Sequence, residues 1–166
     1  MFFFRKKKRR ECGGCTLCCY THRVDIPFEN EPLTKEYEWC KFCEIGKGCS
    51  IYHRRPDGCW KFDCAWLQQE FGTDDERPDK MRIVPEWIRT EFGRTLALIG
   101  ETAEALQTEI ARRITTEYVD RGYAVIHAFP GDRYLLVLPA GTIVSDKILE
   151  LATKEHLEIG FFEAAY

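Results

Sequence analysis

Hydrophobic positions in the second half of the chain follow two periods, one typical of strands and one typical of helices. The apolar run "TLALI", residues 95–99, predicts a short buried strand. Apolar side chains then recur at every fourth position, at Leu106, Ile110, Ile114 and Tyr118. This spacing predicts the buried face of a helix that is capped by Thr102 and runs to about Arg121, where Gly122 ends it.

Two further patterns follow this helix. The segments "YAVIHA", residues 123–128, and "RYLLVL", residues 133–138, flank "FPGD" and predict a β-hairpin. Ser145 is suited to cap a last helix that runs to about Glu158. The positions expected to face inward on it are Ile148, Leu151 and Ala152. Residues 81–166 are therefore predicted to form a small α+β unit.

The first half lacks such regular periods and is marked instead by cysteine. All nine cysteines lie between residues 12 and 64. The polar, turn-rich stretch "QQEFGTDDERPDK", residues 68–80, is typical of a connection between two parts. The sequence thus predicts a basic arm at 1–10, a cysteine-rich module at 11–80 and the α+β part at 81–166.

The cysteines are spaced as metal ligands are. The stretch "ECGGCTLCC", residues 11–19, contains four of them, and "WCKFC" repeats the gap of two residues. Two residues between cysteines allow a tight turn to bring both sulfurs onto one ion, and Gly13 and Gly14 can adopt the positive φ that such a turn needs. The candidate metal ligands are Cys12, Cys15, Cys18, Cys19, Cys40, Cys43, Cys49, Cys59 and Cys64.

Three kinds of chemistry could explain these thiols: disulfide bonds, redox catalysis and metal ligation. Disulfides fit poorly, because nine is an odd number, adjacent cysteines pair only with strain, and the expected cytosolic compartment keeps thiols reduced. Redox catalysis fits a single CxxC pair better than a crowd of thiols. Metal ligation accounts for both the spacing and the crowding. Eight of the cysteines could serve two tetrahedral zinc ions, whereas an iron–sulfur cluster would take four.

Zinc is the favoured metal, because a closed site made of cysteines suits it, and iron or an iron–sulfur cluster is the alternative. A bacterial ferredoxin run would continue with three residues and Cys-Pro, whereas here Cys19 follows Cys18 directly. His22 and His53 are interpreted as surface or hydrogen-bonded residues. Arg55 is the cation expected to offset the charge of the thiolates. An apolar shell is expected from Ile51, Tyr52, Trp60, Phe62 and Trp66.

Both motifs resemble one protein family. "CGGCTLCC" and "CSIYHRRPDGCWKFDCAW", residues 12–19 and 49–66, are similar to the C-x2-C-x2-C-C cysteine-cluster family of zinc- or iron-chelating proteins. The resemblance covers roughly residues 11–80 and implies metal binding by the matching cysteines. Cys40 fits a family cysteine, whereas Cys43 is either an extra ligand or a buried thiol. A related module occurs in a flagellin lysine N-methylase, which leaves an enzymatic role open.

Charge is divided unevenly along the chain. The formal net charge is −3, but residues 1–10 hold six basic side chains and no acidic one, which leaves 18 basic against 27 acidic residues in the rest. An acidic body argues against a protein that wraps nucleic acid. The arm alone could contact RNA or, with Phe2, Phe3 and Phe4 inserting, an anionic membrane.

The remaining features narrow the function. No apolar run is long enough to span a bilayer, and the basic residues follow the first apolar ones, so a cytoplasmic protein without a secretory signal is expected. The α+β part has no phosphate-binding glycine loop, nucleophile elbow or HExxH motif. The sequence thus predicts a metal-binding protein in which metal stabilises an irregular cysteine-rich module packed on the α+β unit. An unidentified protein partner stays open, and no small-molecule substrate is expected.

Overall fold

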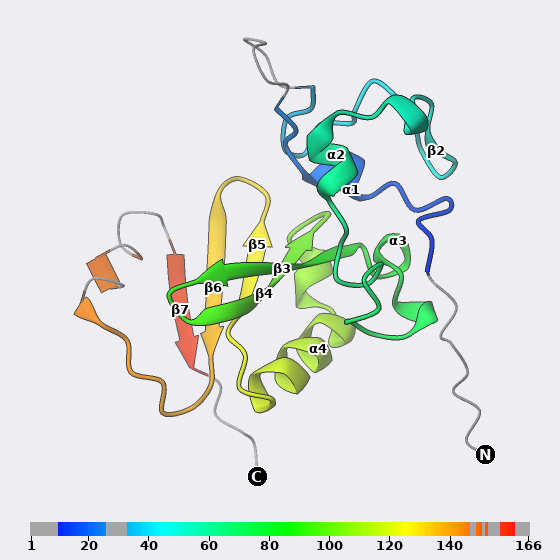
Figure 1. Cartoon of the computed structure of the whole chain (residues 1–166). Helices are drawn as coiled ribbons and strands as arrows, with labels where there is room; N and C mark the ends of the chain where they lie inside the picture. Colours follow the sequence, from blue (N-terminus) through cyan, green and yellow to red (C-terminus); the bar gives the residue numbers. More distant parts are fainter. Residues whose placement is uncertain (1–9, 26–32, 147–148, 151, 153–156, 162–166) are drawn as a thin grey trace, which may run out of the picture.

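The chain is an α+β protein built on a mixed five-stranded sheet, so the predicted fold class is confirmed at this level. The computed structural model describes residues 10–25, 33–146, 149–150, 152 and 157–161 (Figure 1). The described residues between 10 and 66 form a cysteine-rich region of loops, short helices and a two-stranded sheet. Figure 1 shows this region at one end of the molecule, next to the sheet.

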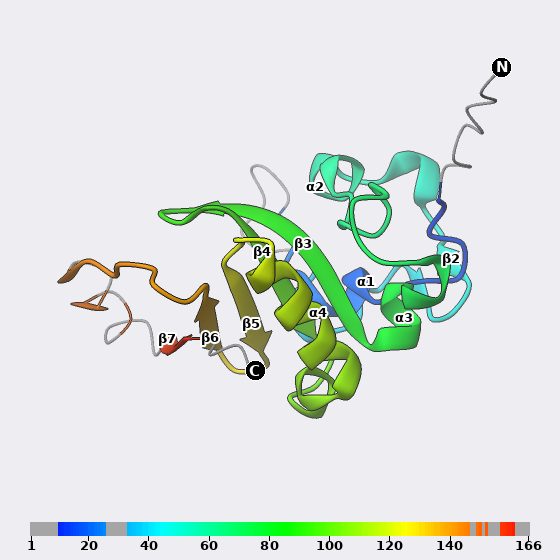
Figure 2. The ribbon, with the colours of Figure 1, turned by 90° about the horizontal axis from the view of Figure 1, so that it is seen from below.

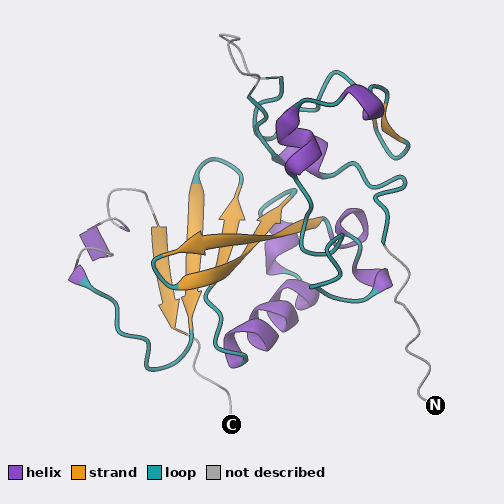
Figure 3. Ribbon diagram, in the orientation of Figure 1, coloured by secondary structure: helices purple, strands orange, loops and turns teal. Residues whose placement is uncertain are grey.

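The helices and strands of the cysteine-rich region are short, whereas the longer ones, α4 and the strands β3 to β7, lie in the rest of the chain (Figure 3). The helices are α1 (Cys18–Thr21), α2 (Asp57–Lys61), α3 (Pro78–Met81) and α4 (Glu109–Asp120), and the 3-10 turns are η1 (Tyr52–Arg54), η2 (Asp74–Glu76) and η3 (Glu104–Gln107). The strands are β1 (Cys43–Glu44), β2 (Gly48–Cys49), β3 (Ile83–Thr90), β4 (Gly93–Gly100), β5 (Val125–Phe129), β6 (Arg133–Leu138) and β7 (Leu157–Phe161).

The five long strands lie in sequence order, β3-β4-β5-β6-β7. β3 and β4 pair antiparallel, as do β5 and β6, whereas β4 pairs parallel with β5 and β6 pairs parallel with β7. A parallel pair needs a crossover connection rather than a tight turn. Between β4 and β5 this crossover contains η3 and α4, which places the helix against the sheet.

Helix α4 buries one face against the sheet. Its buried side chains are Ala111, Ile114, Thr115, Tyr118 and Val119. They repeat at three- and four-residue intervals, as the apolar face of an amphipathic helix does. Together with Leu96, Leu98 and Val125 of β4 and β5, the apolar ones form the main hydrophobic core. Figure 2 shows α4 from below, in front of the sheet.

The helix predicted from Thr102 to Arg121 is divided in two. Thr108 interrupts it, since its hydroxyl accepts a hydrogen bond from the Ala111 N–H at 3.2 Å and caps α4. Ile110 lies in the first turn of α4 with 39% of its surface exposed, so its predicted burial is wrong, whereas Ile114 and Tyr118 further along the same helix are buried. Gly122 follows the helix with a φ of 87°, as expected of a terminating glycine.

The predicted strand at 95–99 is confirmed within β4, and the predicted hairpin is confirmed as β5 and β6. The prediction of a last helix is right at its start and wrong at its end. Asp146, Leu149–Glu150 and Ala152 are helical, and Ala152 is buried, while Ile148 and Leu151 lie outside the described residues. The chain from Leu157 is strand β7, because β6 offers its free edge for pairing.

Strand β3 has no clear pattern in the sequence because it contains Pro85 together with charged residues. A proline lacks the N–H that a central strand needs, but β3 lies at the edge of the sheet, where this group is dispensable. The Pro85 carbonyl accepts a hydrogen bond from the Ala65 N–H at 2.8 Å. This bond joins the end of the cysteine-rich region to the sheet.

The stretch predicted as a connection is packed into the molecule. Phe71 is only 2% exposed and belongs to the main core, next to Trp66. The side chain of Arg10 donates hydrogen bonds to the carbonyls of Trp66, Phe71 and Gly72 at 2.9, 2.7 and 2.7 Å. Arg10 therefore fixes this loop, while residues 1–9 of the predicted basic arm lie outside the described residues.

Candidate metal centre

Two of the three CxxC pairs that were predicted as metal turns, Cys12–Cys15 and Cys40–Cys43, adopt turns closed by a backbone hydrogen bond. The Cys15 N–H donates to the Cys12 carbonyl at 2.8 Å, and the Cys43 N–H donates to the Cys40 carbonyl at 2.9 Å. Gly13 has a φ of 53°, which a residue with a side chain adopts only at a cost. Gly13 therefore permits the Cys12–Cys15 turn, whereas the Cys40–Cys43 turn forms without a glycine.

Backbone hydrogen bonds bring the central cysteines together. Cys18 and Cys19 begin helix α1, and the Cys19 carbonyl accepts a hydrogen bond from the Cys40 N–H at 3.0 Å. Cys43 in β1 lies opposite Cys49 in β2 as a cross-strand pair. These contacts connect the Cys18–Cys19 segment with the hairpin that carries Cys43 and Cys49 and with Cys40 just before it.

Electrostatic interactions divide the nine cysteines into two groups. In the first thiol group, Cys12, Cys15 and Cys64 act on one another, in addition to the larger effect of burial on their pKa values. The second thiol group consists of the other six: Cys18, Cys19, Cys40, Cys43, Cys49 and Cys59. An interaction between Cys12 and Cys19 links the two groups.

The surroundings of the thiols disfavour their deprotonated form and raise their pKa values. Burial raises the pKa of Cys64 and of Cys43 to about 11 in each case. Burial also raises the pKa of Cys40, although the backbone N–H groups of Phe42 and Cys43 act in the opposite direction by hydrogen bonding to its sulfur. Such thiols stay protonated at neutral pH unless a cation replaces the proton, and a bound metal is a cation of this kind.

Arg55 lies where the sequence predicted a compensating cation. Its guanidinium carbon is 3.8 Å from the centre of the Tyr52 ring and 4.4 Å from that of Trp60. Its charge lowers the pKa of Cys12 in the first thiol group and of Cys19 in the second, against the stronger raising effects on both. The Nε atom of Arg55 is buried and has no hydrogen-bond partner in the described structure.

The expected apolar shell forms only in part. Trp66 is buried, and its indole N–H donates to the Thr73 carbonyl at 2.8 Å. Tyr52 and Trp60 are instead 45% and 50% exposed, because they enclose Arg55 from outside. Phe62 packs against the His22 ring at 4.5 Å.

The histidines are placed as hydrogen-bonded or packed residues. His22 Nδ1 lies 2.7 Å from the Thr21 hydroxyl, and its Nε2 lies 3.4 Å from a Glu86 carboxylate oxygen of β3. The His53 ring packs edge-on against Tyr52. His127 is in strand β5, where it is buried and its Nε2 lies 2.7 Å from the Thr115 hydroxyl.

An acidic side chain beside the first thiol group was not expected from the sequence. Asp79, in α3, accepts hydrogen bonds from Arg77 Nε at 2.6 Å and from Arg77 Nη2 at 2.7 Å. These bonds, the charge of Arg77 and a hydrogen bond from Cys15 lower the pKa of Asp79. A lone aspartate in the polar run "ERPDK" carries no signal of this role, since only folding brings it to the cysteines.

All nine cysteines are free. As the side chains stand, no group of three or more His, Cys, Asp or Glu in the described part of the chain could hold a metal ion. Thiols are donors that structural zinc accepts, but the described side chains are not arranged around a common ion.

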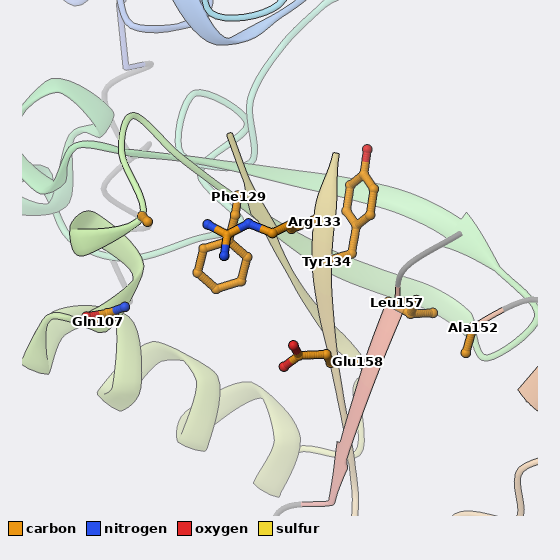
Figure 4. Close-up of a pocket in the computed structure, with 8 residues that line it drawn as sticks. Gln107, Phe129, Arg133, Tyr134, Ala152, Leu157 and Glu158 are labelled. Atoms are coloured by element: carbon orange, nitrogen blue, oxygen red, sulfur yellow. The ribbon is translucent and has the colours of Figure 1, made fainter. Parts of the chain in front are cut away.

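A separate pocket of about 590 Å³ lies in the α+β part (Figure 4). It is lined by Ala103, Gln107, Phe129, Arg133, Tyr134, Ala152, Leu157 and Glu158. The guanidinium of Arg133 lies over the Phe129 ring at 5.6 Å, and Glu158 of β7 carries the opposite charge. No cysteine is among these lining residues, so this pocket is separate from the thiol groups.

Among the described residues, no helix combines the length and the apolar character needed to cross a membrane. Comparison of the chain with protein-family models, with curated proteins and with solved structures gave no match. The resemblance to the cysteine-cluster family therefore stays a prediction that rests on the two motifs.

Proposed function

We propose that this chain is a metal-binding protein in which the two thiol groups hold metal, and in which the metal mainly stabilises the cysteine-rich region. The observation that carries the proposal is that nine cysteines are free and that backbone pairing brings Cys19 beside Cys40 and Cys43 opposite Cys49. Buried thiols with raised pKa values gain little from one another as neutral groups. Bound to a metal as thiolates, they gain a strong common partner.

Zinc is the metal that the proposal favours. Closed sites rich in cysteine are typical of structural zinc, and two of the three CxxC pairs form turns stabilised by backbone hydrogen bonds. Arg55 supports the same proposal. Thiolates on a divalent ion leave a net negative charge, and its unpartnered Nε–H could donate to one of the sulfurs once they are deprotonated.

The proposal is tested by the metal content of the purified protein. The full chain is purified without oxygen, its absorption spectrum is recorded, and zinc, iron and sulfide are measured per chain. A colourless protein with about two zinc ions per chain is the expected result. A brown protein with iron and sulfide would replace structural zinc by an iron–sulfur cluster, and a protein without bound metal would refute the proposal.

A further inference from the structure

Two of the cysteines lie directly opposite one another in a hairpin. Cys43 of β1 and Cys49 of β2 are cross-strand partners in an antiparallel pair. The Ser50 N–H donates to the Phe42 carbonyl at 2.9 Å, so the residue after Cys49 is bonded to the residue before Cys43. In an antiparallel ladder such a bond flanks a pair that exchanges no hydrogen bonds itself. The Cα atoms of such a pair are about 4.5 Å apart, and both side chains point to the same face.

This geometry meets the requirement for a disulfide bond. Bridged cysteines have Cα atoms about 4.4–6.8 Å apart, and a cross-strand pair without hydrogen bonds lies inside this range. Both thiols are free and only partly buried, so a small oxidant in solution can reach them. Adjacent cysteines, an odd total and a reducing compartment argue against a framework of permanent disulfides. They do not argue against one bond that forms only under an oxidant.

Contacts outside the pair hold the hairpin in this register. The Lys47 N–H donates to the Glu44 carbonyl at 2.8 Å and closes the turn. The Gly46 N–H donates to the Thr16 hydroxyl oxygen at 3.2 Å. A Cβ atom added at Gly14 would lie 2.5 Å from the Gly46 carbonyl oxygen, so the turn packs directly against this backbone. None of these contacts involves a thiol, and a bond between the two sulfurs therefore requires no change of register.

We propose that Cys43 and Cys49 form a reversible disulfide when a peroxide oxidises the chain, and that this bond displaces one metal ion. One thiolate of the pair attacks the peroxide: an S–O bond forms, the O–O bond breaks, and the leaving hydroxide takes up a proton to give water. The second thiol then attacks the sulfenic sulfur, so that the S–S bond forms, the S–O bond breaks and a second water leaves. Two thiols and one hydrogen peroxide thus give one disulfide and two waters, and a dithiol reductant reverses the bond.

The displacement of metal rests on the proposed function. Two tetrahedral zinc sites need eight thiolates, and the nine cysteines are enough to supply them. The disulfide withdraws two, which leaves one too few for the second ion. Oxidation of the pair therefore converts exposure to peroxide into release of metal. The bond itself depends only on the geometry of the hairpin.

Digestion with trypsin identifies this bond unambiguously. Trypsin cleaves after Lys41, Lys47 and Arg54, which leaves the two cysteines on separate peptides with one cysteine each. The full chain, as purified, receives one equivalent of hydrogen peroxide, and its digest is analysed by mass spectrometry without reduction. Released zinc is measured with a chromogenic chelator. The expected result is a cross-link between the two peptides, loss of two free thiols per chain and release of one zinc ion, with the cross-link removed by dithiothreitol.

Two variants separate this pair from the other cysteines. Cys49→Ser removes one partner, so the same dose of peroxide should leave Cys43 without a disulfide. Ser50→Ala is the matched control in the same hairpin. It removes the hydroxyl that donates to the Phe42 carbonyl at 3.1 Å and keeps the backbone hydrogen bond to that carbonyl. S50A should form the cross-link to the same extent as the wild type.

Absence of the cross-link in the wild type, or bonds from either peptide mainly to other cysteines, would overturn the inference. So would a C49S variant in which Cys43 enters a disulfide to the wild-type extent. Cross-linking of a zinc-loaded chain without release of zinc would overturn the displacement alone. A chain purified without metal would refute the proposed function and the displacement with it, whereas the cross-link would still decide whether the disulfide forms.

Discussion

The cysteine-rich region and the α+β part bury their side chains to very different extents. In the α+β part, strands of five to eight residues and the twelve-residue α4 enclose a continuous core around Leu96 and Leu98. In the cysteine-rich region the elements have two to five residues, and Trp39, Ile45 and Trp60 remain exposed. Hydrophobic burial accounts for the first part, and we propose that bound metal adds to the stability of the second.

The largest predicted effect concerns the thiols themselves. Cys40→Ser should remove the metal of the second thiol group and leave that of the first, and Cys12→Ser should do the reverse. Structural zinc binds with an apparent free energy of about 10–16 kcal/mol, so loss of a ligand should unfold the local loops. Metal per chain and far-ultraviolet circular dichroism measure this. Retention of both ions in either variant would contradict the division into two groups.

A substitution in the hydrophobic core should lower the stability of the α+β part and leave the cysteine-rich region unchanged. Leu98 is fully buried between α4 and the sheet. Leu98→Ala should lower the free energy of unfolding of the α+β part by about 2–5 kcal/mol, because it removes buried methyl groups and leaves a cavity. Urea unfolding followed by tryptophan fluorescence measures the change, and metal content should stay at the wild-type value. The matched control is Ile143→Ala, at a side chain that is 91% exposed, where no change is expected.

His127 should make the α+β part sensitive to acid. Burial lowers the pKa of His127 to about 4, from 6.5. Between these values the unfolded chain binds a proton that the native chain excludes, so stability falls as the pH drops from 6.5 towards 4. The total loss should approach about 3 kcal/mol, at 1.36 kcal/mol for each pKa unit.

His127→Gln removes the titrating group and can keep a hydrogen bond to Thr115. Urea unfolding at pH 7 and pH 4.5 should therefore show a smaller loss of stability for H127Q than for wild type. Release of metal by acid affects both proteins alike and cancels in the comparison. Equal losses in the two proteins would show that His127 accepts its proton in the native state.

Substitution of Arg10, which lies at the junction of the two regions, should change stability least among these predictions. Its side chain is only 12% exposed and holds three backbone carbonyls of the loop from Trp66 to Gly72. Arg10→Ala should cost about 1–3 kcal/mol, because the carbonyls lose a charged donor. Hydrogen exchange in that loop measures the effect. Lys61→Ala, at an exposed ion pair, should change nothing measurable, and an equal effect of both substitutions would count against the role of Arg10.

Local signals in the sequence were sufficient for elements that depend on neighbouring residues. The hairpin followed from "FPGD" between two apolar runs, and the end of α4 followed from Gly122. Elements decided by distant partners were missed or misjudged. Strand β3 is tolerated with Pro85 only because it lies at an edge, and β7 replaces the end of a predicted helix because β6 lies beside it.

In the candidate site, too, features that depend on neighbouring residues were predicted, and features that depend on distant partners were missed. The two CxxC turns and the position of Arg55 were predictable, because each depends on a few adjacent residues. The approach of Cys19 to Cys40 was not, since it depends on a backbone hydrogen bond between segments that are about twenty residues apart. Asp79 belongs to this second kind, because its neighbours in sequence give no sign of the cysteines it meets.

The central claim, that metal holds the cysteine-rich region while hydrophobic burial holds the α+β part, is tested most directly by hydrogen exchange on the full chain before and after a chelator removes its metal. The account predicts that amides from Cys12 to Cys64 lose protection on metal removal, whereas those of β4, β5 and α4 keep it. Unchanged protection between Cys12 and Cys64 in protein shown to be metal-free would contradict the account.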